Sequence, residues 1–291
     1  MKNRTPRIIA SVLALFLLAG MWFFLPSRVA DLPIATDADT IAKGEYLVHA
    51  AGCISCHISS SQPPALSGGL ALPSPFGSFY VPNITPDPST GIGGWSGRDL
   101  LAAIKHGRSP DGRFYFPAFP YRSYAGMTDE DAMAIAAWLM AQEPVIADTA
   151  DHELPAPEWL ARLAMGPWNR LADMRSVEFP SYEDEDIRRG AYLARHLGHC
   201  GECHTPRDRF GIPDLRREFA GAPLADGEAE AIDAAAMHEW TEQDFSFFLF
   251  LGLKPDEDYV GGEMEPVIEY NTSPLTEADR NALAAFFIRG Q

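Results

Sequence analysis

The chain has 291 residues and only four cysteines, which form two copies of one motif: CISCH at residues 53–57 and CGECH at residues 200–204. C-x-x-C-H is the attachment pattern of c-type haem, in which two thioethers hold the porphyrin and the adjacent histidine binds the iron. The sequence therefore predicts two covalently bound haem c groups. Their expected attachments are thioethers from Cys53, Cys56, Cys200 and Cys203, with His57 and His204 as the proximal iron ligands.

Two other kinds of site compete for the same cysteines. A single four-thiolate zinc site could use all of them, and a thioredoxin-like redox site could use one pair. Neither site requires a histidine directly after each second cysteine. Two complete haem motifs, with no cysteine left over for a disulfide, favour haem in a chain that we expect to be exported.

The residues around the two motifs form an internal repeat. The string IAKGEYLVH at 41–49 leads into the first motif, and IRRGAYLAR at 187–195 leads into the second. Capping signatures of the form S/T-x-x-D then predict two further helices in each copy, since the side chain satisfies a free N–H group at a helix start. These helices begin after Ser96 and Thr128 in the first copy, and after Thr241 and Thr276 in the second. In both copies a glycine lies 11 residues after the first of these caps, where it suits a helix end (Gly107, Gly252).

The repeat divides the chain into four parts. We expect an N-terminal membrane anchor or signal peptide at 1–30, one small helical domain at 31–145, a linker at 146–182 and a second domain at 183–291. The linker contains a short amphipathic segment, PEWLARLAMGPWNRLADM at 157–174. We expect its apolar side to pack across the two domains.

The N-terminus carries an apolar run of 18 uncharged residues, Ile8–Leu25, preceded by Lys2, Arg4 and Arg7. As a helix it would span roughly 27 Å, close to the hydrocarbon thickness of a bilayer. Positive charges before the run place the remainder of the chain in the periplasm. We expect an uncleaved anchor. A cleaved signal peptide is the alternative, although Arg28 fits poorly with cleavage after Ala30.

The formal charge of the chain is −17, which excludes nucleic acid as a partner because phosphate binding needs clustered Lys and Arg. An acidic surface can steer the chain toward a basic patch on a redox partner, or can serve solubility alone.

Four longer strings carry a resemblance to a known family, at residues 68–96, 116–139, 189–208 and 261–279. They resemble the multihaem cytochrome c subunits of periplasmic membrane-bound dehydrogenases. The resemblance implies an all-α fold, namely a tandem pair of class I cytochrome c domains after one N-terminal transmembrane helix. It also implies electron relay from a dehydrogenase that oxidises an alcohol, an aldehyde or a sugar acid to a membrane quinone or oxidase. Many such subunits hold three haems, whereas this chain has motifs for two.

The two halves differ where the second axial ligand of each iron is expected. Met264 lies 23 residues after Thr241 and is the expected distal ligand of the second haem, since a methionine thioether is the usual choice in electron transfer. The corresponding residue of the first half is Phe119, which cannot bind iron. Met127, eight residues farther on, is the tentative replacement.

Three alternatives to Met127 stay open. An apolar residue directly before the cap at Thr128 commonly packs against the helix start, and Leu275 has the same place in the second half. His106 is another candidate, although a histidine at a helix end interacts favourably with the helix dipole. The iron of the first haem is otherwise open or water-bound. An open iron would permit a haem enzyme, peroxidase-like or acting on sulfur compounds, as the alternative to a non-catalytic relay; we identify no catalytic residue.

Overall fold

The computed structural model describes residues 20, 24, 28–57, 66–225 and 227–291. Nearly all of the predicted anchor at Ile8–Leu25 lies outside these residues. Within the described ranges, no helix combines the length and apolar character needed to cross a bilayer.

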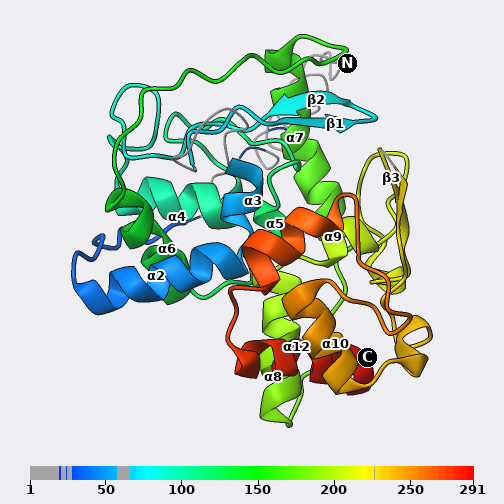
Figure 1. The fold of residues 1–291 in the computed structure, drawn as a ribbon. Coiled ribbons are helices and arrows are strands. Elements are labelled where there is room, and N and C mark those ends of the chain that lie inside the picture. Colours follow the sequence, from blue (N-terminus) through cyan, green and yellow to red (C-terminus); the bar gives the residue numbers. More distant parts are fainter. Residues whose placement is uncertain (1–19, 21–23, 25–27, 58–65, 226) are drawn as a thin grey trace, which may run out of the picture.

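The chain is mostly helical (Figure 1). We use "first half" for the elements from α2 to α6 and "second half" for those from α8 to α12. The helices of the first half are α2 (Ala38–Ala50), α3 (Cys53–His57), α4 (Gly97–His106), α5 (Tyr121–Tyr124) and α6 (Asp129–Met140). Helix α7 (Glu158–Asp173) follows. The second half contains α8 (Glu185–Tyr192), α9 (Gly201–His204), α10 (Glu242–Leu251), α11 (Met264–Val267) and α12 (Glu277–Arg289).

The first long helix of each half packs closely against the last. A Cβ atom added to Gly44 of α2 would lie 2.0 Å from the carbonyl oxygen of Ala134 in α6, and one added to Gly190 of α8 would lie 1.9 Å from that of Ala282 in α12. Only glycine permits backbones to approach this closely. The two glycines therefore fix the same helix crossing in both halves.

The predicted helix starts and ends are confirmed. Ser96 and Thr241 each form a capping box with the aspartate three residues later. Gly107 and Gly252 end α4 and α10 in the left-handed conformation, with φ of 58° and 71°.

One irregularity separates the halves near the cysteine motifs. Cys53 lies nine positions after Gly44 in the sequence, whereas Cys200 lies ten positions after Gly190. The extra residue is accommodated in a π-helical turn, η1 (Leu193–Leu197), which continues α8. A second π-helical turn, η4 (Ile268–Thr272), follows α11. The remaining short turns are 3₁₀-helical, η2 (Leu215–Arg217) and η3 (Ala236–Glu239).

The expectation of a purely α-helical fold is wrong in one respect. Each half contains a two-stranded antiparallel hairpin between its haem motif and its next long helix. The hairpins are formed by β1 (Ala71–Ser74) with β2 (Gly77–Tyr80), and by β3 (Ala222–Leu224) with β4 (Gly227–Ala229). Short strands of this kind brace the long connections.

Helix α7 contacts both halves, but not through its large apolar side chains; its buried residues are Gly166 and Ala172. Arg162 donates to the carbonyl of Phe114 at 2.7 Å, and Trp168 donates from Nε1 to the carbonyl of Phe210 at 2.8 Å. The large apolar side chains Trp159, Leu160 and Leu163 are exposed instead. The expectation that the apolar side packs across the two domains is therefore wrong.

The two halves share one apolar core. The buried cluster runs continuously from Leu47 and Ile135 in the first half to Leu197 and Phe286 in the second. Residues of α2 also contact the π-helical turns of the second half. The cysteine motifs, which directly follow α2 and η1, are consequently held near the centre of the molecule.

Candidate haem sites

The first motif forms a single short helix, α3, after a sharp turn at Gly52. Gly52 has a φ of 67°, a conformation that glycine adopts without strain, and it turns the chain from α2 into α3. His57 at the end of α3 is only 8% exposed, and its Nδ1 lies 2.8 Å from the carbonyl oxygen of Pro82. Because a carbonyl only accepts, Nδ1 carries the proton and Nε2 keeps a free lone pair for a metal.

The second motif repeats this arrangement in α9. Nδ1 of His204 lies 2.7 Å from the carbonyl oxygen of Glu230 and donates to it. The turn before the motif is made by His199, which adopts a φ of 42° although it is not glycine. Both histidines of the motifs are thus oriented by a backbone carbonyl, with Nε2 available as a ligand.

Burial sets the protonation of these groups. It lowers the pKa of His57 to about 4, and it also lowers the pKa of His204, so both imidazoles are neutral at pH 7, the form that binds iron. Burial raises the pKa of the Cys53 and Cys200 thiols to about 12.

The geometry gives no support to a zinc site. No disulfide joins any of the four cysteines, and within the described part of the chain no three His, Cys, Asp or Glu side chains gather as a metal site would require. A neutral histidine beside a pair of cysteines on one helical turn fits a covalently bound haem.

Aromatic side chains line the interior of the second half beside its motif. Phe219 packs against Phe287 with ring centroids 5.1 Å apart, and Trp240 packs against Phe245 at 5.6 Å and against Phe248 at 5.4 Å. A planar apolar macrocycle fits such surroundings. This packing agrees with the proximal histidines in favouring haem.

The two positions expected to supply the distal ligands differ in their surroundings. Met264 is half-buried and begins α11, packed against the apolar core. Phe119 is packed against Tyr115 and Tyr124, with ring centroids 6.0 and 5.6 Å away. Its ring thus belongs to an aromatic group within the first half.

Met127 is only 2% exposed and lies in the apolar core, directly before the cap of α6. Leu275, in the same place before α12, is 6% exposed. His106 ends α4 and lines a cleft of about 150 Å³ together with Tyr121 and Asn169, on the side that faces α7. Burial is the main reason that its pKa is lowered.

The halves meet through two reciprocal contacts. Tyr46 of α2 donates to Asp279 of α12 at 2.6 Å and accepts from the backbone N–H of Thr276. Tyr192 of α8 donates to Asp131 of α6 at 2.7 Å and accepts from the backbone N–H of Thr128. Each tyrosine therefore binds the start of the last helix of the opposite half.

Each aspartate of these contacts also binds a cation of its own half. Asp131 pairs with Lys43 at 2.8 Å, and Asp279 pairs with Arg189 at 2.6 Å. Burial opposes ionisation of both carboxyls, but the hydrogen bonds from the cation and the tyrosine outweigh it, and the pKa of each lies below its ordinary value.

The two cysteine motifs also face each other across this interface. A Cβ atom on Gly52 would lie 3.1 Å from Nε2 of His199 and 3.0 Å from Nδ2 of Asn271. The His199 ring lies edge-on to Tyr124 with centroids 5.6 Å apart, and Tyr124 donates to the carbonyl of Ala51. Gly52 and His199, which directly precede Cys53 and Cys200, are therefore neighbours.

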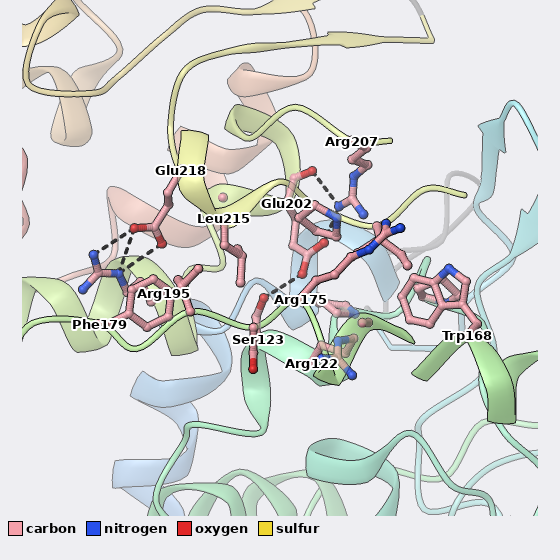
Figure 2. A pocket seen from close by; sticks show the side chains of 18 of the residues that line it. Arg122, Ser123, Trp168, Arg175, Phe179, Arg195, Glu202, Arg207, Leu215 and Glu218 are labelled. Carbon is pink, nitrogen blue, oxygen red and sulfur yellow. Dashed lines mark hydrogen bonds and ion pairs between the residues drawn. The ribbon is translucent and has the colours of Figure 1, made fainter. Parts of the chain in front are cut away.

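Figure 2 shows a cavity of about 210 Å³ where the loop before α5, helix α7 and the second half meet. Ser123 donates to Glu202 at 2.6 Å across this junction, and Glu202 also pairs with Arg207. Each of the four arginines at the cavity already has a carboxylate partner. The pairs are Arg122 with Asp173, Arg175 with Asp208, Arg195 with Glu218, and Arg207 with Glu202. The cavity therefore lies at the junction of the two halves, and its four arginines are already paired and not free to bind an anion.

Comparison with known proteins shows which family the chain belongs to. Residues 41–143 match the family model of cytochrome c. A dihaem cytochrome c-type protein of Cereibacter sphaeroides is 40% identical over 97% of this chain and 98% of its own length. The chain belongs to the dihaem c-type cytochromes. Membership implies covalently bound haem c and a cytochrome c fold.

This cytochrome is also related to subunits of membrane-bound dehydrogenases. The fructose dehydrogenase cytochrome subunit of Gluconobacter japonicus is 34% identical over 87% of this chain. The cytochrome c subunit of the quinone alcohol dehydrogenase of Gluconacetobacter polyoxogenes is 32% identical over 96% of it. The cytochrome spans 53% and 60% of the lengths of these two subunits.

Several residues that shape the sites of the cytochrome were not identified from its sequence. Pro82 and Glu230 act through backbone carbonyls, so their side chains give no signal. Tyr46 and Tyr192 did carry a signal, because they recur at the same place in IAKGEYLVH and IRRGAYLAR. Their partners are Asp279 and Asp131, the aspartates of two capping signatures. From the sequence we expected these aspartates only to mark helix starts.

Proposed function

We propose that this cytochrome relays electrons on the periplasmic side of the cytoplasmic membrane, between a dehydrogenase-type donor and a quinone or oxidase acceptor. Haem c, when bound, supplies reversible one-electron exchange at its iron. The observation that carries the proposal is the repetition of the proximal arrangement: His57 on Pro82 and His204 on Glu230, at two motifs that face each other. Two sites with the same histidine arrangement in one shared core suit a relay better than a single reactive centre.

The assignment of residues is part of this proposal. Cys53, Cys56, Cys200 and Cys203 hold the haems, His57 and His204 bind iron on one side, and Met264 completes the second site. We assign Met127 to the first site. Its support is its place on the segment between Phe119 and α6, beyond the short helix α5, and its buried sulfur would reach the iron only if the turn at Gly126 moved.

The chain organisation proposed here follows the repeat. One cytochrome c domain of class I occupies 31–145 and a second occupies 183–291, with 146–182 as the linker. The apolar run Ile8–Leu25 anchors the chain in the membrane, with its N-terminus in the cytoplasm. The relatedness to subunits named for fructose and alcohol dehydrogenases supports a dehydrogenase as the donor.

One observation favours a second function, a haem enzyme that reacts at the first site. Phe119, which cannot bind iron, stands where the second half has Met264. If Met127 does not bind the iron either, the first site has an open position, which ligand-binding haem chemistry requires.

Titration of the reduced full-length protein with carbon monoxide distinguishes the two functions. A relay with Met127 and Met264 as ligands keeps both haems low-spin and takes up no carbon monoxide. Uptake of one equivalent, with one haem high-spin before the titration, contradicts the closed first site and supports the enzyme. Stopped-flow reduction by a purified donor dehydrogenase tests the relay itself, and no reduction of either haem would contradict it.

A further inference from the structure

Helix α7 exposes a broad apolar face. Trp159 is 70% exposed, Leu160 45% and Leu163 50%, and residues at this spacing lie on one side of a helix. Ala164 and Pro167 are exposed on the same side one turn later. Large apolar side chains grouped in this way mark a surface that contacts a protein or a membrane.

The opposite side of α7 is fastened to both halves, so the helix cannot turn to bury this face. Tyr121 donates to Asn169 at 2.9 Å, Arg122 pairs with Asp173 at 3.0 Å, and Trp168 donates to the carbonyl of Phe210 at 2.8 Å. These bonds hold α7 at its C-terminal half, and the bond from Arg162 to Phe114 holds it nearer its start. The exposed orientation is therefore a property of the fold.

Two phenylalanines outside the helix are also exposed. Phe210, whose carbonyl accepts from Trp168, is 44% exposed. Phe76 at the turn between β1 and β2 is 46% exposed and packs beside Gly211. We use "apolar face" for Trp159, Leu160 and Leu163 on α7.

The chain leaves its apolar N-terminal run beside α7. The ring of Phe24 lies 6.3 Å from that of Phe114, and Arg108 donates to the carbonyl of Phe24 at 3.4 Å. Phe114 is also the residue whose carbonyl accepts from Arg162 of α7. An anchor that ends at this point would hold α7 close to the bilayer surface.

We propose that the apolar face of α7 lies in the headgroup region of the membrane and fixes the orientation of the cytochrome on it. The inference rests on the proposed membrane anchor. Tryptophan is enriched at membrane interfaces, and an amphipathic helix with Trp and Leu on one face is typical of interfacial binding. Glu158 and Asp173 balance Arg162 and Arg170 within α7, so anionic lipids would not repel this helix although the whole chain carries −17.

The test uses the full-length protein with both haems in vesicles of phosphatidylcholine and phosphatidylglycerol. Its native cysteines are consumed by haem attachment, so a single new cysteine is the only reactive thiol. Leu163→Cys places it on the apolar face. Leu251→Cys is the matched control, since this leucine is 46% exposed and belongs to α10, a helix that Figure 1 shows well apart from the start of α7.

We expect a water-soluble maleimide to modify Leu163→Cys about tenfold more slowly than Leu251→Cys in vesicles. A diazirine-bearing phospholipid in the same vesicles should crosslink to α7 and not to α10. Equal modification rates at the two positions would overturn the inference. So would slow modification without lipid crosslinking, because a second copy or another part of this chain would then cover the face. Crosslinking at both positions would contradict a fixed orientation.

Sedimentation of the vesicles separates the possible failures. If the Leu163→Cys variant sediments with the vesicles while its new thiol is modified rapidly, the anchor is intact and only the role of α7 is overturned. Protein that stays in the supernatant would contradict the anchor, and the inference with it. Electron relay is measured on its own by reduction of the haems.

Discussion

At their haem sites, the two halves of this cytochrome are alike where the backbone makes the contact and different where a side chain must. His57 and His204 are oriented by the carbonyls of Pro82 and Glu230, which belong to unlike residues. At the position where the repeat predicts the second iron ligand the halves diverge, with Phe119 in one and Met264 in the other. A role carried by the backbone tolerates substitution, whereas a role carried by a sulfur atom does not.

The second long helices of the two halves show the same divergence. In α4 the buried residues include Leu100, Leu101 and Ala103, whereas in α10 they include Phe245 and Phe248. Both helices keep their capping boxes and their terminal glycines. The frame of the repeat is thus the same in both halves while the surroundings of the two sites differ, which would set different potentials at the two irons.

The largest effect is expected from removing one attachment motif at a time. Cys53→Ala with Cys56→Ala should lower the covalent haem content from about two per chain to about one, and so should Cys200→Ala with Cys203→Ala. The pyridine haemochrome spectrum and the intact mass measure the loss. A variant that keeps both haems would contradict the attachment assigned to that half.

Replacing the proposed distal ligands should affect one haem each. Met264→Leu should make the second haem high-spin and able to bind about one equivalent of carbon monoxide. Met127→Leu should do the same for the first haem. Met133→Leu, a buried methionine of α6, is the control. If Met127→Leu behaves like this control, the first site lacks a methionine ligand and the asymmetry between the halves becomes larger.

Replacing the glycine at either helix crossing with alanine should lower the free energy of unfolding by a similar amount. Gly44→Ala and Gly190→Ala each force a methyl group against a carbonyl oxygen, at 2.0 and 1.9 Å, and should lower the free energy of unfolding by about 1–3 kcal/mol. Gly94→Ala, with open space around its Cβ, should change it by less than about 0.5 kcal/mol. Denaturant titration measures all three. Unequal losses at the two crossings would show that one half is the more deformable.

The smallest effect is expected at the reciprocal contacts. Tyr46→Phe and Tyr192→Phe each remove the hydrogen bond donated to a partly buried carboxylate and the one accepted from a backbone N–H, and should cost about 1–2 kcal/mol at neutral pH. Tyr259→Phe, at an exposed tyrosine, should cost nothing measurable. Thermal unfolding followed by circular dichroism measures these costs, and a cost for only one of the pair would contradict their equivalence.

Acid should weaken the same contacts. The pKa values of Asp131 and Asp279 are lowered in the folded protein, so the stability that they contribute is complete above their ordinary pKa near 4. It is lost as the pH falls through the lower folded pKa values. Removing a tyrosine brings the pKa of its aspartate closer to the ordinary value and should move the acid unfolding midpoint to higher pH.

The sequence predicts the parts of this fold that depend on local patterns. The capping residues, the terminal glycines and the duplicated helices follow from spacing, because each acts within a few residues of itself. The carbonyls that orient the proximal histidines lie 25 and 26 residues away and carry no residue-type signal. The prediction of which side of α7 packs against the two halves was wrong. An amphipathic pattern shows that a helix has an apolar side but not what covers that side.

The reciprocal contacts of Tyr46 and Tyr192 have a consequence for how the molecule is assembled. Each half supplies the tyrosine of one contact and the aspartate of the other, so the joining surface is self-complementary, as in a twofold dimer. Such a surface is fully used when two partners pair, so no part of it remains to bind a third. The cytochrome therefore resembles a homodimer whose subunits have been tethered, and the tether keeps each half at a high effective concentration for the other whenever they separate.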